Sequence, residues 1–419
     1  MIQKPKGTKD VLPDEIFKWK YIEGTANIVF ENYGYKEVRI PTFEYTELFE
    51  RGVGDTTDVV QKEMYTFEDK AGRSITLRPE GTAGVIRSFI ENGLSSKTLP
   101  LKVHYAMPMF RYENVQKGRY REFNQIGAEL IGTASYLADV EMIAMADRFL
   151  KELVLKDVYL SINSIGCPAC RAKYQEALKQ FIGINLEKYC STCKTRFDKN
   201  TMRILDCKEA NCKELNKGEP IILDYLCDEC NMHFENVKKG LDKLGIKYTI
   251  DSSIVRGLDY YTKTVFEFIS KTDGYTVLAG GRYDGLVKEL GGQNTPAVGF
   301  AAGEERLLSL LENAEEIDYP PLELYIASLD EKYDLEAIEL AEELRKCFQV
   351  QTNISLRSFN AQMKYANKIN AQYLIVLGED EIKNKKCKLK NMKTGEEKEA
   401  DMSFEGISEI IKNMEIITQ

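Results

Sequence analysis

Residues that could bind a charged ligand recur at every second position between Arg119 and Glu129. Because side chains alternate between the two faces of a strand, an extended chain here places on one face Arg119, Arg121, Phe123, Gln125, Gly127 and Glu129. That face would grade from guanidinium groups at one end to a single carboxylate at the other. An ordinary solvated sheet face would instead mix Lys, Glu and Thr. The grading predicts an anion at one end and a cationic or hydrogen-bonding group at the other.

The arginine end of this face has the chemistry of a nucleotide site. Guanidinium forks match phosphate oxygens, and the Phe123 ring can stack on a purine. Arg111 and Glu113 share a face of the preceding strand-like run. The chain contains neither G-x-x-x-x-G-K-[ST] nor G-x-G-x-x-G, so a P-loop or Rossmann site is excluded. Gly280-Gly281 taken alone is more typical of a turn than of a phosphate cradle.

Eight of the ten cysteines fall between Cys167 and Cys230. They form three C-x-x-C pairs and one looser pair, which are Cys167 with Cys170, Cys190 with Cys193, Cys227 with Cys230, and Cys207 with Cys212. Such spacing places two thiolates within reach of one tetrahedral ion. One or two structural zinc sites, reduced thiols in a helical insertion and disulfides are all open, and we assign no metal-ligating residue.

Several elements must position these residues. Apolar residues at helical spacing predict a helix from 16 to 33, and strand-like runs at 101–113 and 120–132 predict a large antiparallel hairpin. The cysteine-rich segment, 166–245, reads as an insertion into a domain of residues 1–320. The proline pair at 320–321 predicts a linker, after which strands and helices alternate over 323–419, as in a small α/β domain.

Composition bounds the function. The 419 residues carry a net charge of −9, so any contact with RNA must be local. Only His104 and His233 are present, which argues against a histidine-based triad or metal site. No apolar run is long enough to span a membrane, and the first 15 residues lack a signal-peptide core, so we expect a cytoplasmic protein.

The motifs together resemble the class II aminoacyl-tRNA synthetases, and within them the histidyl family. Segments 110–113 and 116–123 look like motif 2, the stretch ending at Pro41 resembles motif 1, and Gly299 to Arg306 resembles motif 3. RGLDYYTKTVFE, at 256–267, resembles the histidine-specific signature, and the resemblance runs from end to end. The chain departs at Asn114-Val115, where many members carry an arginine-proline pair, and at Ala301, where many class II enzymes have glycine.

The resemblance implies a role for each motif residue. Those implied to bind histidine are Glu80, Thr82 and Gln125 at the α-amino group, and Glu129 and Tyr261 at the imidazole, with Tyr260 in the same pocket. Those implied to bind ATP are Arg111 at the α-phosphate, Arg119 at the outer phosphates, Phe123 and Arg306 on either side of the adenine, and Glu113. Arg256 and Arg111 are the implied catalytic residues.

The fold implied is α+β: a class II antiparallel sheet core with a helical cysteine-rich insertion, followed by an α/β anticodon-binding domain. The reaction implied is ATP- and Mg²⁺-dependent ligation of L-histidine to tRNA(His) through histidyl-adenylate, by a homodimer. The alternative is a non-catalytic histidine-sensing regulatory subunit of ATP phosphoribosyltransferase. Such paralogues usually lack the C-terminal domain and catalytic arginines, whereas this chain has residues 323–419, Arg111, Arg256 and Arg306.

Overall fold

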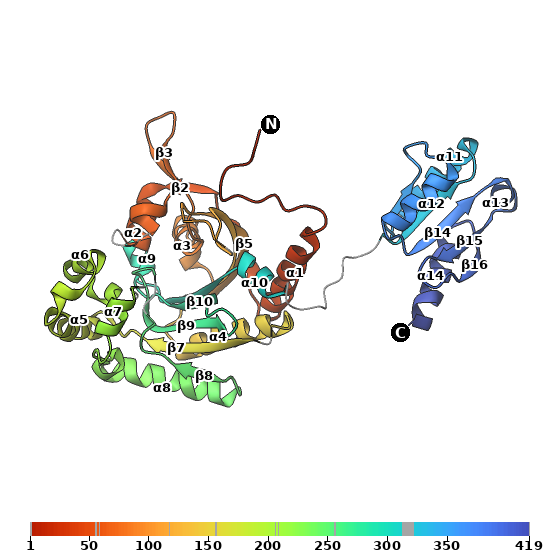
Figure 1. The fold of residues 1–419 in the computed structure, drawn as a ribbon. Helices are drawn as coiled ribbons and strands as arrows, with labels where there is room; N and C mark the ends of the chain where they lie inside the picture. Colours follow the sequence, from red (N-terminus) through yellow and green to blue (C-terminus); the bar gives the residue numbers. More distant parts are fainter. Residues whose placement is uncertain are drawn as a thin grey trace. The chain divides into compact units, whose positions relative to one another are not determined.

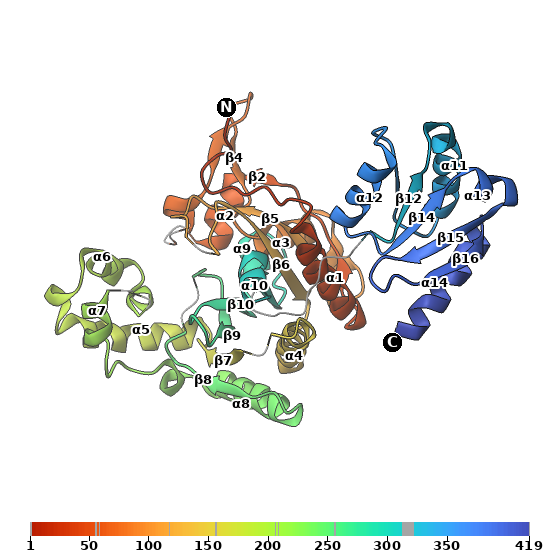
Figure 2. The same cartoon turned by 45° about the vertical axis from the view of Figure 1, so that its right-hand side comes forward.

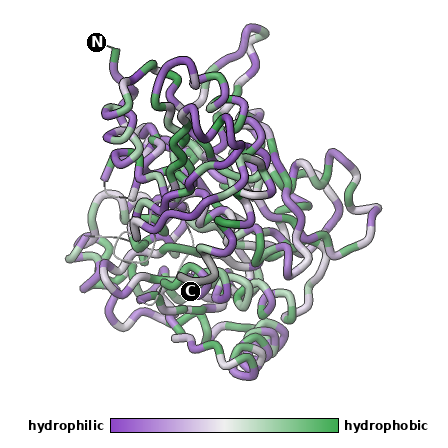
Figure 3. Tube along the Cα trace, turned by 90° about the vertical axis from the view of Figure 1, so that its right-hand side faces the viewer, coloured by the Kyte–Doolittle hydropathy of each residue, from purple (hydrophilic) through white to green (hydrophobic). Residues whose placement is uncertain are grey.

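The computed structural model describes residues 2–54, 57, 59–116, 118–155, 157–205, 207, 209–254, 257–311 and 322–418. The chain forms two compact units, residues 1–317 and 318–419 (Figure 1). Hydrophobic and hydrophilic residues are interspersed along the trace in Figure 3. Within the described ranges, no helix has the length and apolar character needed to cross a bilayer.

An eight-stranded sheet is the centre of the first unit. Its order is β1 (Lys36–Glu37), β5 (Leu101–Phe110), β6 (Glu122–Ile131), β11 (Ala297–Gly303), β10 (Thr276–Arg282), β9 (Thr262–Ser270), β7 (Val158–Ser164) and β8 (Tyr248–Ile250). The six central strands are antiparallel, and the short edge strands β1 and β8 pair in parallel. The predicted hairpin is therefore confirmed as β5–β6, although its strands end at Phe110 and begin again at Glu122.

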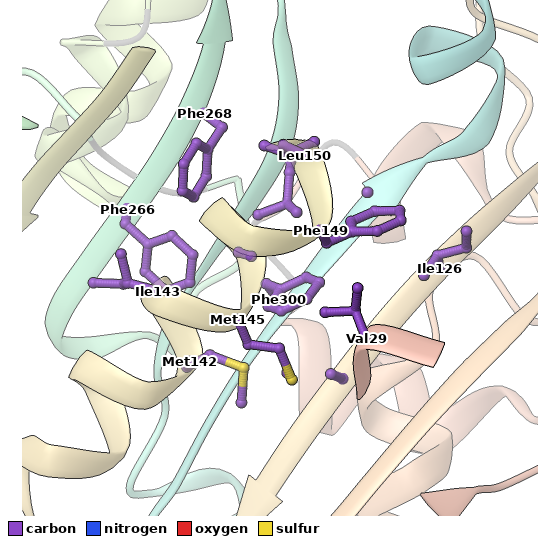
Figure 4. Close-up of a cluster of buried hydrophobic side chains, with 14 of the residues drawn as sticks. Val29, Ile126, Met142, Ile143, Met145, Phe149, Leu150, Phe266, Phe268 and Phe300 are labelled. Carbon is purple, nitrogen blue, oxygen red and sulfur yellow. The ribbon is translucent and has the colours of Figure 1, made fainter. Parts of the chain in front are cut away.

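One face of this sheet is covered by helices. They are α1 (Ile16–Asn32), α4 (Tyr136–Glu152), α8 (Asp228–Lys243) and α10 (Glu304–Leu311). The even-numbered residues Ile126, Ala128 and Leu130 of β6 join this core. Figure 4 shows Phe149 of α4 and Phe300 of β11 in the layer between helix and sheet, where both rings contact Phe30 of α1. Alternation then directs the odd-numbered residues of β6 to the other face.

The other face is lined by smaller elements and leaves room for a ligand. These elements are α2 (Thr46–Val53), α3 (Thr82–Glu91) and α9 (Leu286–Glu289), together with a three-stranded sheet of β2 (Phe43–Tyr45), β4 (Ser74–Leu77) and β3 (Thr66–Glu68). Ile131, Tyr105 and Met109 pack on this side. The two faces of β6 are thus divided between core and site.

The cysteine-rich segment leaves the sheet after β7 and returns through α8 to β8. It contains α5 (Pro168–Gly183), α6 (Ser191–Lys199) and α7 (Ala210–Leu215), which lie together beyond the end of β7 in Figure 2. A core of its own includes Tyr174, Leu178, Ile182 and Ile204. The predicted helical character of the insertion is confirmed.

The second unit has a sheet of order β13 (Val350–Thr352), β12 (Leu324–Ser328), β14 (Tyr373–Leu377), β15 (Lys386–Asn391) and β16 (Glu397–Asp401). The first three strands are parallel and the last two antiparallel. Its helices are α11 (Asp334–Leu344), α12 (Phe359–Lys368), α13 (Glu379–Asn384) and α14 (Phe404–Thr418). The predicted small α/β fold is confirmed for the three parallel strands and their helices. The expectation of a mostly parallel sheet is not met, because β15 and β16 add two antiparallel pairings to the two parallel ones.

Candidate active site

A cavity of about 330 Å³ opens on the ligand face of the large sheet. Ten of the residues predicted for the site line it: Glu80, Thr82, Arg111, Glu113, Arg119, Phe123, Gln125, Tyr260, Tyr261 and Arg306. An eleventh, Glu129, contacts the lining residues Thr82 and Tyr283 through hydrogen bonds. Arg256 lies outside the described residues. One surface therefore carries both ends of the predicted gradient.

Glu129 is a buried carboxyl group that receives three hydroxyl hydrogen bonds. Thr82 Oγ1 donates to Oε1 over 2.8 Å, Tyr105 donates to the same oxygen over 3.4 Å, and the Tyr283 hydroxyl donates to Oε2. Burial raises the pKa of Glu129 to about 8, although these hydroxyls favour the charged form. A pKa raised this far favours the protonated form of Glu129 at neutral pH.

The space for Glu129 comes from Gly299 on the neighbouring strand. The two residues are paired in the β6–β11 register, and a Cβ at position 299 would lie 1.7 Å from Glu129 Oε2. Gly127 makes room in the same way for the Tyr105 ring, which a Cβ there would approach to 2.3 Å. The lack of side chains at these two glycines leaves space for the Glu129 carboxyl and the Tyr105 ring to lie side by side on one face of the sheet.

Glu80 lies at the start of α3, beside the same pocket. Its carboxylate accepts from the backbone N–H groups of Thr82, over 2.8 Å, and Ala83, over 2.7 Å. Burial raises its pKa, and these two N–H groups oppose that rise. Opposite, the buried amide oxygen of Gln125 has no hydrogen-bond partner among the described residues. An unpaired buried acceptor is costly unless a ligand donates to it.

Three tyrosines close this end of the cavity. The Tyr260 and Tyr261 rings lie 4.7 Å apart, and Tyr283 is 5.5 Å from Tyr260 and 6.4 Å from Tyr261. Tyr105 and Tyr283, which orient Glu129, were not predicted. The spacing of Tyr105 from Met107 along one strand face was the available signal, whereas Tyr283 required knowledge of the sheet order.

The other end of the cavity is cationic. Arg111 lies over the Phe123 ring at 5.2 Å, and Glu113 forms ion pairs with Arg111 at 3.7 Å and Arg119 at 3.4 Å. The Arg306 guanidinium donates to the Thr276 carbonyl, and burial lowers its pKa. Three guanidinium groups thus line this end of the cavity together with the Phe123 ring.

The alternation argument was wrong beyond the ends of the strands. Arg111, Glu113 and Arg119 reach the cavity from the connecting segment, not from the ladder. Arg121 was expected on the same face, but its guanidinium lies 3.7 Å from the Tyr112 ring centroid and does not line the cavity. A strand period cannot be extended into a loop, where no ladder fixes the direction of side chains.

Glu305 is a further carboxyl group in the lining, which the sequence placed in the motif 3 resemblance without a role of its own. It follows the first residue of α10, and its Oε1 accepts from the Asn124 backbone N–H over 2.8 Å. Burial raises its pKa to about 7. The contact ties the start of α10, and with it Arg306, to β6.

Both histidines lie away from the cavity. His104 is buried with its ring 5.5 Å from Phe30, and burial lowers its pKa. His233 Nε2 lies 3.3 Å from Asp139 Oδ2, beside the buried Asp139–Arg282 ion pair on the helical face. Neither position lines the cavity described above.

Comparisons with known proteins agree with this geometry. The family profile described as histidyl-tRNA synthetase matches residues 7–307, and the anticodon binding domain profile matches residues 323–414. The histidine--tRNA ligase of Acetivibrio thermocellus is 54% identical over 408 residues, covering 96% of this chain and 98% of that protein.

Solved structures resemble it as well. The crystal structure of apo histidyl-tRNA synthetase from S. aureus has a TM-score of 0.81 and 39% identity, covering 96% of this chain and 98% of that one. A structure described as an ATP phosphoribosyltransferase regulatory subunit/histidyl-tRNA synthetase from Bacillus halodurans has a TM-score of 0.67 at 23% identity, covering 90% and 99%, and shares the fold. With a family profile matching most of its length and a relative more than half identical, this chain belongs to the histidyl-tRNA synthetase family.

Proposed function

We propose that this chain ligates L-histidine to tRNA(His) at the expense of ATP, through a histidyl-adenylate. The observation that carries the proposal is the single cavity with a buried, hydroxyl-bound carboxyl at one end and three guanidinium groups at the other. A histidine side chain needs the first, and a nucleoside triphosphate needs the second.

Histidine is proposed to lie with its imidazole toward Glu129 and Tyr261, beside Tyr260. Its α-amino group would donate to Glu80, Thr82 and Gln125. The unpaired Gln125 oxygen supports this orientation, since an ammonium group would supply the missing donor. A pocket with buried polar groups also rejects amino acids that leave those groups unpaired.

ATP is proposed to lie at the cationic end. Arg111 would bind the α-phosphate, Arg119 would reach the outer phosphates, and the adenine would stack between Phe123 and Arg306. Magnesium would accompany the phosphates, and Glu113 and Glu305, which both line the cavity, would offer it the carboxylate oxygens that it prefers. Its chemistry there is to neutralise charge on the departing pyrophosphate.

The reaction then needs no protein nucleophile. The histidine carboxylate attacks the α-phosphorus and pyrophosphate leaves, after which a terminal ribose hydroxyl of the tRNA attacks the histidyl carbonyl and AMP leaves. The protein holds the two substrates in line and stabilises charge, with Arg111 and Arg256 assigned to the reacting phosphate.

The second unit is proposed to bind the anticodon. On and before α12, Lys364 and Lys368 are exposed, and the Arg357 guanidinium lies 4.0 Å from the Tyr365 ring centroid. A cationic surface with an aromatic ring suits single-stranded RNA, whose bases stack on such rings.

A homodimer in the cytoplasm is the proposed working form. Phe43 and Tyr45 of β2 and Phe67 of β3 are about half exposed, at 56%, 54% and 49%. Neighbouring exposed aromatics of this kind favour a protein contact. Light scattering should give twice the chain mass of 47.9 kDa, and a mass of one chain at micromolar concentration would refute the dimer.

The function is tested by pyrophosphate exchange with ATP and each amino acid in turn, followed by charging of tRNA(His). Exchange that depends on histidine alone is expected. Substitution Arg256→Ala should reduce exchange much more than histidine binding. Histidine binding without any exchange by the unsubstituted chain would instead identify the regulatory-subunit alternative.

A further inference from the structure

We propose that the cysteine-rich insertion binds two structural zinc ions, each through four thiolates. We call the two groups the root cluster and the tip cluster. The root cluster is Cys167, Cys170, Cys227 and Cys230, and the tip cluster is Cys190, Cys193, Cys207 and Cys212. Nothing in the proposed ligation reaction uses either group, so this inference stands apart from that function.

The sulfur positions fit a tetrahedral ion. Within each cluster all four sulfurs lie within 4.8 Å of one another. Two of the separations are 3.5 Å, between Cys167 and Cys170, and 3.9 Å, between Cys190 and Cys207. A tetrahedral zinc with bonds of about 2.3 Å holds its sulfurs about 3.8 Å apart. A disulfide would need about 2.05 Å.

Each C-x-x-C pair is placed at the start of a helix. Cys167, Cys190 and Cys227 are the N-cap residues of α5, α6 and α8. Backbone N–H groups point at sulfur in both clusters: that of Cys227 at Cys170 Sγ, 3.1 Å away, and that of Cys190 at Cys212 Sγ, 3.4 Å away. Such N–H groups and the positive ends of helices favour thiolate, the form that binds metal.

Packing alone does not account for the grouping. A reduced cysteine behaves as a small apolar residue, which would explain why Cys193 and Cys212 are buried. It would not explain why all eight cysteines of the insertion divide into two groups of four with none left over. The two remaining cysteines, Cys347 and Cys387, lie in the second unit.

The hydrophobic core of the insertion is small, so a metal crosslink would add to its stability. Its short helices share a small core in which Cys193, Cys207 and Cys212 are themselves members. Modules with so little apolar interior are usually held by metals or disulfides. The tip cluster joins α6 to α7, and the root cluster joins the segment where the chain leaves the sheet to the segment where it returns.

The root cluster lies next to the wall of the substrate cavity. The Lys263 backbone N–H donates to the Gly166 carbonyl over 2.9 Å, and Arg171 of α5 donates to the Tyr261 carbonyl over 3.2 Å. In the tip region, Arg203 donates to the Gly257 carbonyl over 2.7 Å. Zinc in both clusters would therefore hold the insertion rigid where it supports the segment 257–261.

The test is the zinc content of the full-length chain, purified without chelator and measured by plasma mass spectrometry. Two zinc ions per chain are expected. The double substitution Cys167→Ser with Cys227→Ser should leave one, as should Cys190→Ser with Cys212→Ser. The control Cys347→Ser, at an exposed position of the second unit, should retain two. A wild-type chain without zinc overturns the proposal. If one double-serine variant keeps the zinc content of the wild type, the cluster that it disrupts does not bind zinc.

A second measurement covers the case in which the serine variants fail to fold. Wild-type chain stripped of metal is titrated with Co²⁺, and tetrahedral thiolate coordination predicts sulfur-to-cobalt charge-transfer bands that saturate at two ions per chain. Alkylation mapped by mass spectrometry should then find the eight insertion cysteines protected with metal and reactive without it. Absence of the bands, or recovery of the eight cysteines as disulfides, contradicts the zinc sites.

Discussion

Replacement of Glu129 by glutamine tests the histidine pocket most directly. The amide keeps the size of the side chain and removes its ionisation. Thr82 and Tyr283 donate to different oxygens of Glu129, so in the glutamine variant one hydroxyl keeps its acceptor and the other must rotate to accept from the amide NH₂. What is lost is a charge-assisted hydrogen bond to the imidazole, worth about 1.5–3 kcal/mol. Histidine affinity should therefore fall about 10- to 150-fold at neutral pH.

The pH dependence gives a sharper result. Free Glu129, with a pKa of about 8, holds a proton that it can share with a neutral imidazole on binding. Above pH 8 both the Glu129 carboxyl and the imidazole have lost their protons, so the shared proton must be taken from solution. The affinity of the wild-type protein for histidine should therefore fall about tenfold per pH unit. The glutamine variant has no such step. Because the ligand's own ionisations affect both proteins, the ratio of the two affinities isolates Glu129.

The assay is calorimetric titration of histidine into each protein without ATP, over a series of pH values. Glu152→Gln, at the exposed C-terminal end of α4 on the opposite face of the sheet, serves as the matched control and should bind as wild type. An affinity ratio near one at every pH would show that Glu129 does not touch the imidazole. A ratio that is large but constant through pH 8 would retain the contact and refute the shared proton.

Three further substitutions have defined outcomes. Gly299→Ala places a methyl group against Glu129, and we expect at least a tenfold loss of histidine affinity with about 1–3 kcal/mol of destabilisation, read from calorimetric titration and thermal melting. Arg111→Lys replaces the planar, bidentate guanidinium group by a single ammonium group. The rate of pyrophosphate exchange should fall about 100-fold, while the affinity for histidine stays within twofold of wild type. Equal losses of exchange rate and histidine affinity would contradict a role limited to the phosphate. Asp139→Asn removes the fully buried carboxylate paired with Arg282 and leaves that guanidinium with Asp284, 3.1 Å away, as its charge partner. A destabilisation of up to about 3 kcal/mol should lower the melting temperature by several degrees, and an unchanged melt would refute the Asp139–Arg282 ion pair as a structural element.

The parts of the fold that were predictable from the sequence are those fixed by local periodicity. The β5–β6 hairpin and the division of β6 into a core face and a ligand face follow from alternation, and both are found in the structure. The same is true of α1 and of the strand β11 leading into α10. In each case the pattern extends over enough residues for burial to select a single register.

The parts that could not be predicted depend on which distant strands become neighbours. The order β6–β11–β10 brings Tyr283 to Glu129 across 154 positions of sequence, and no local pattern encodes that contact. Gly280-Gly281, which resembled a turn in isolation, lies inside β10. The buried Asp139–Arg282 pair was missed for the same reason, since one partner comes from α4 and the other from β10.

The core and the candidate site use opposite faces of β6, so both depend on the register in which this strand pairs with its neighbours. Ile126, Ala128 and Leu130 pack under the helices, whereas Gln125 lines the cavity and Glu129 contacts its lining residues. Core and site therefore use alternate positions of the same ten-residue strand. A one-residue slip would bury the carboxyl among phenylalanines and expose the apolar side chains. Burial of an unpaired carboxyl costs several kcal/mol, which the slipped strand has no hydroxyls to offset. The residues proposed to discriminate histidine therefore also penalise the wrong register, so that one strand would determine both correct folding and the proposed binding specificity.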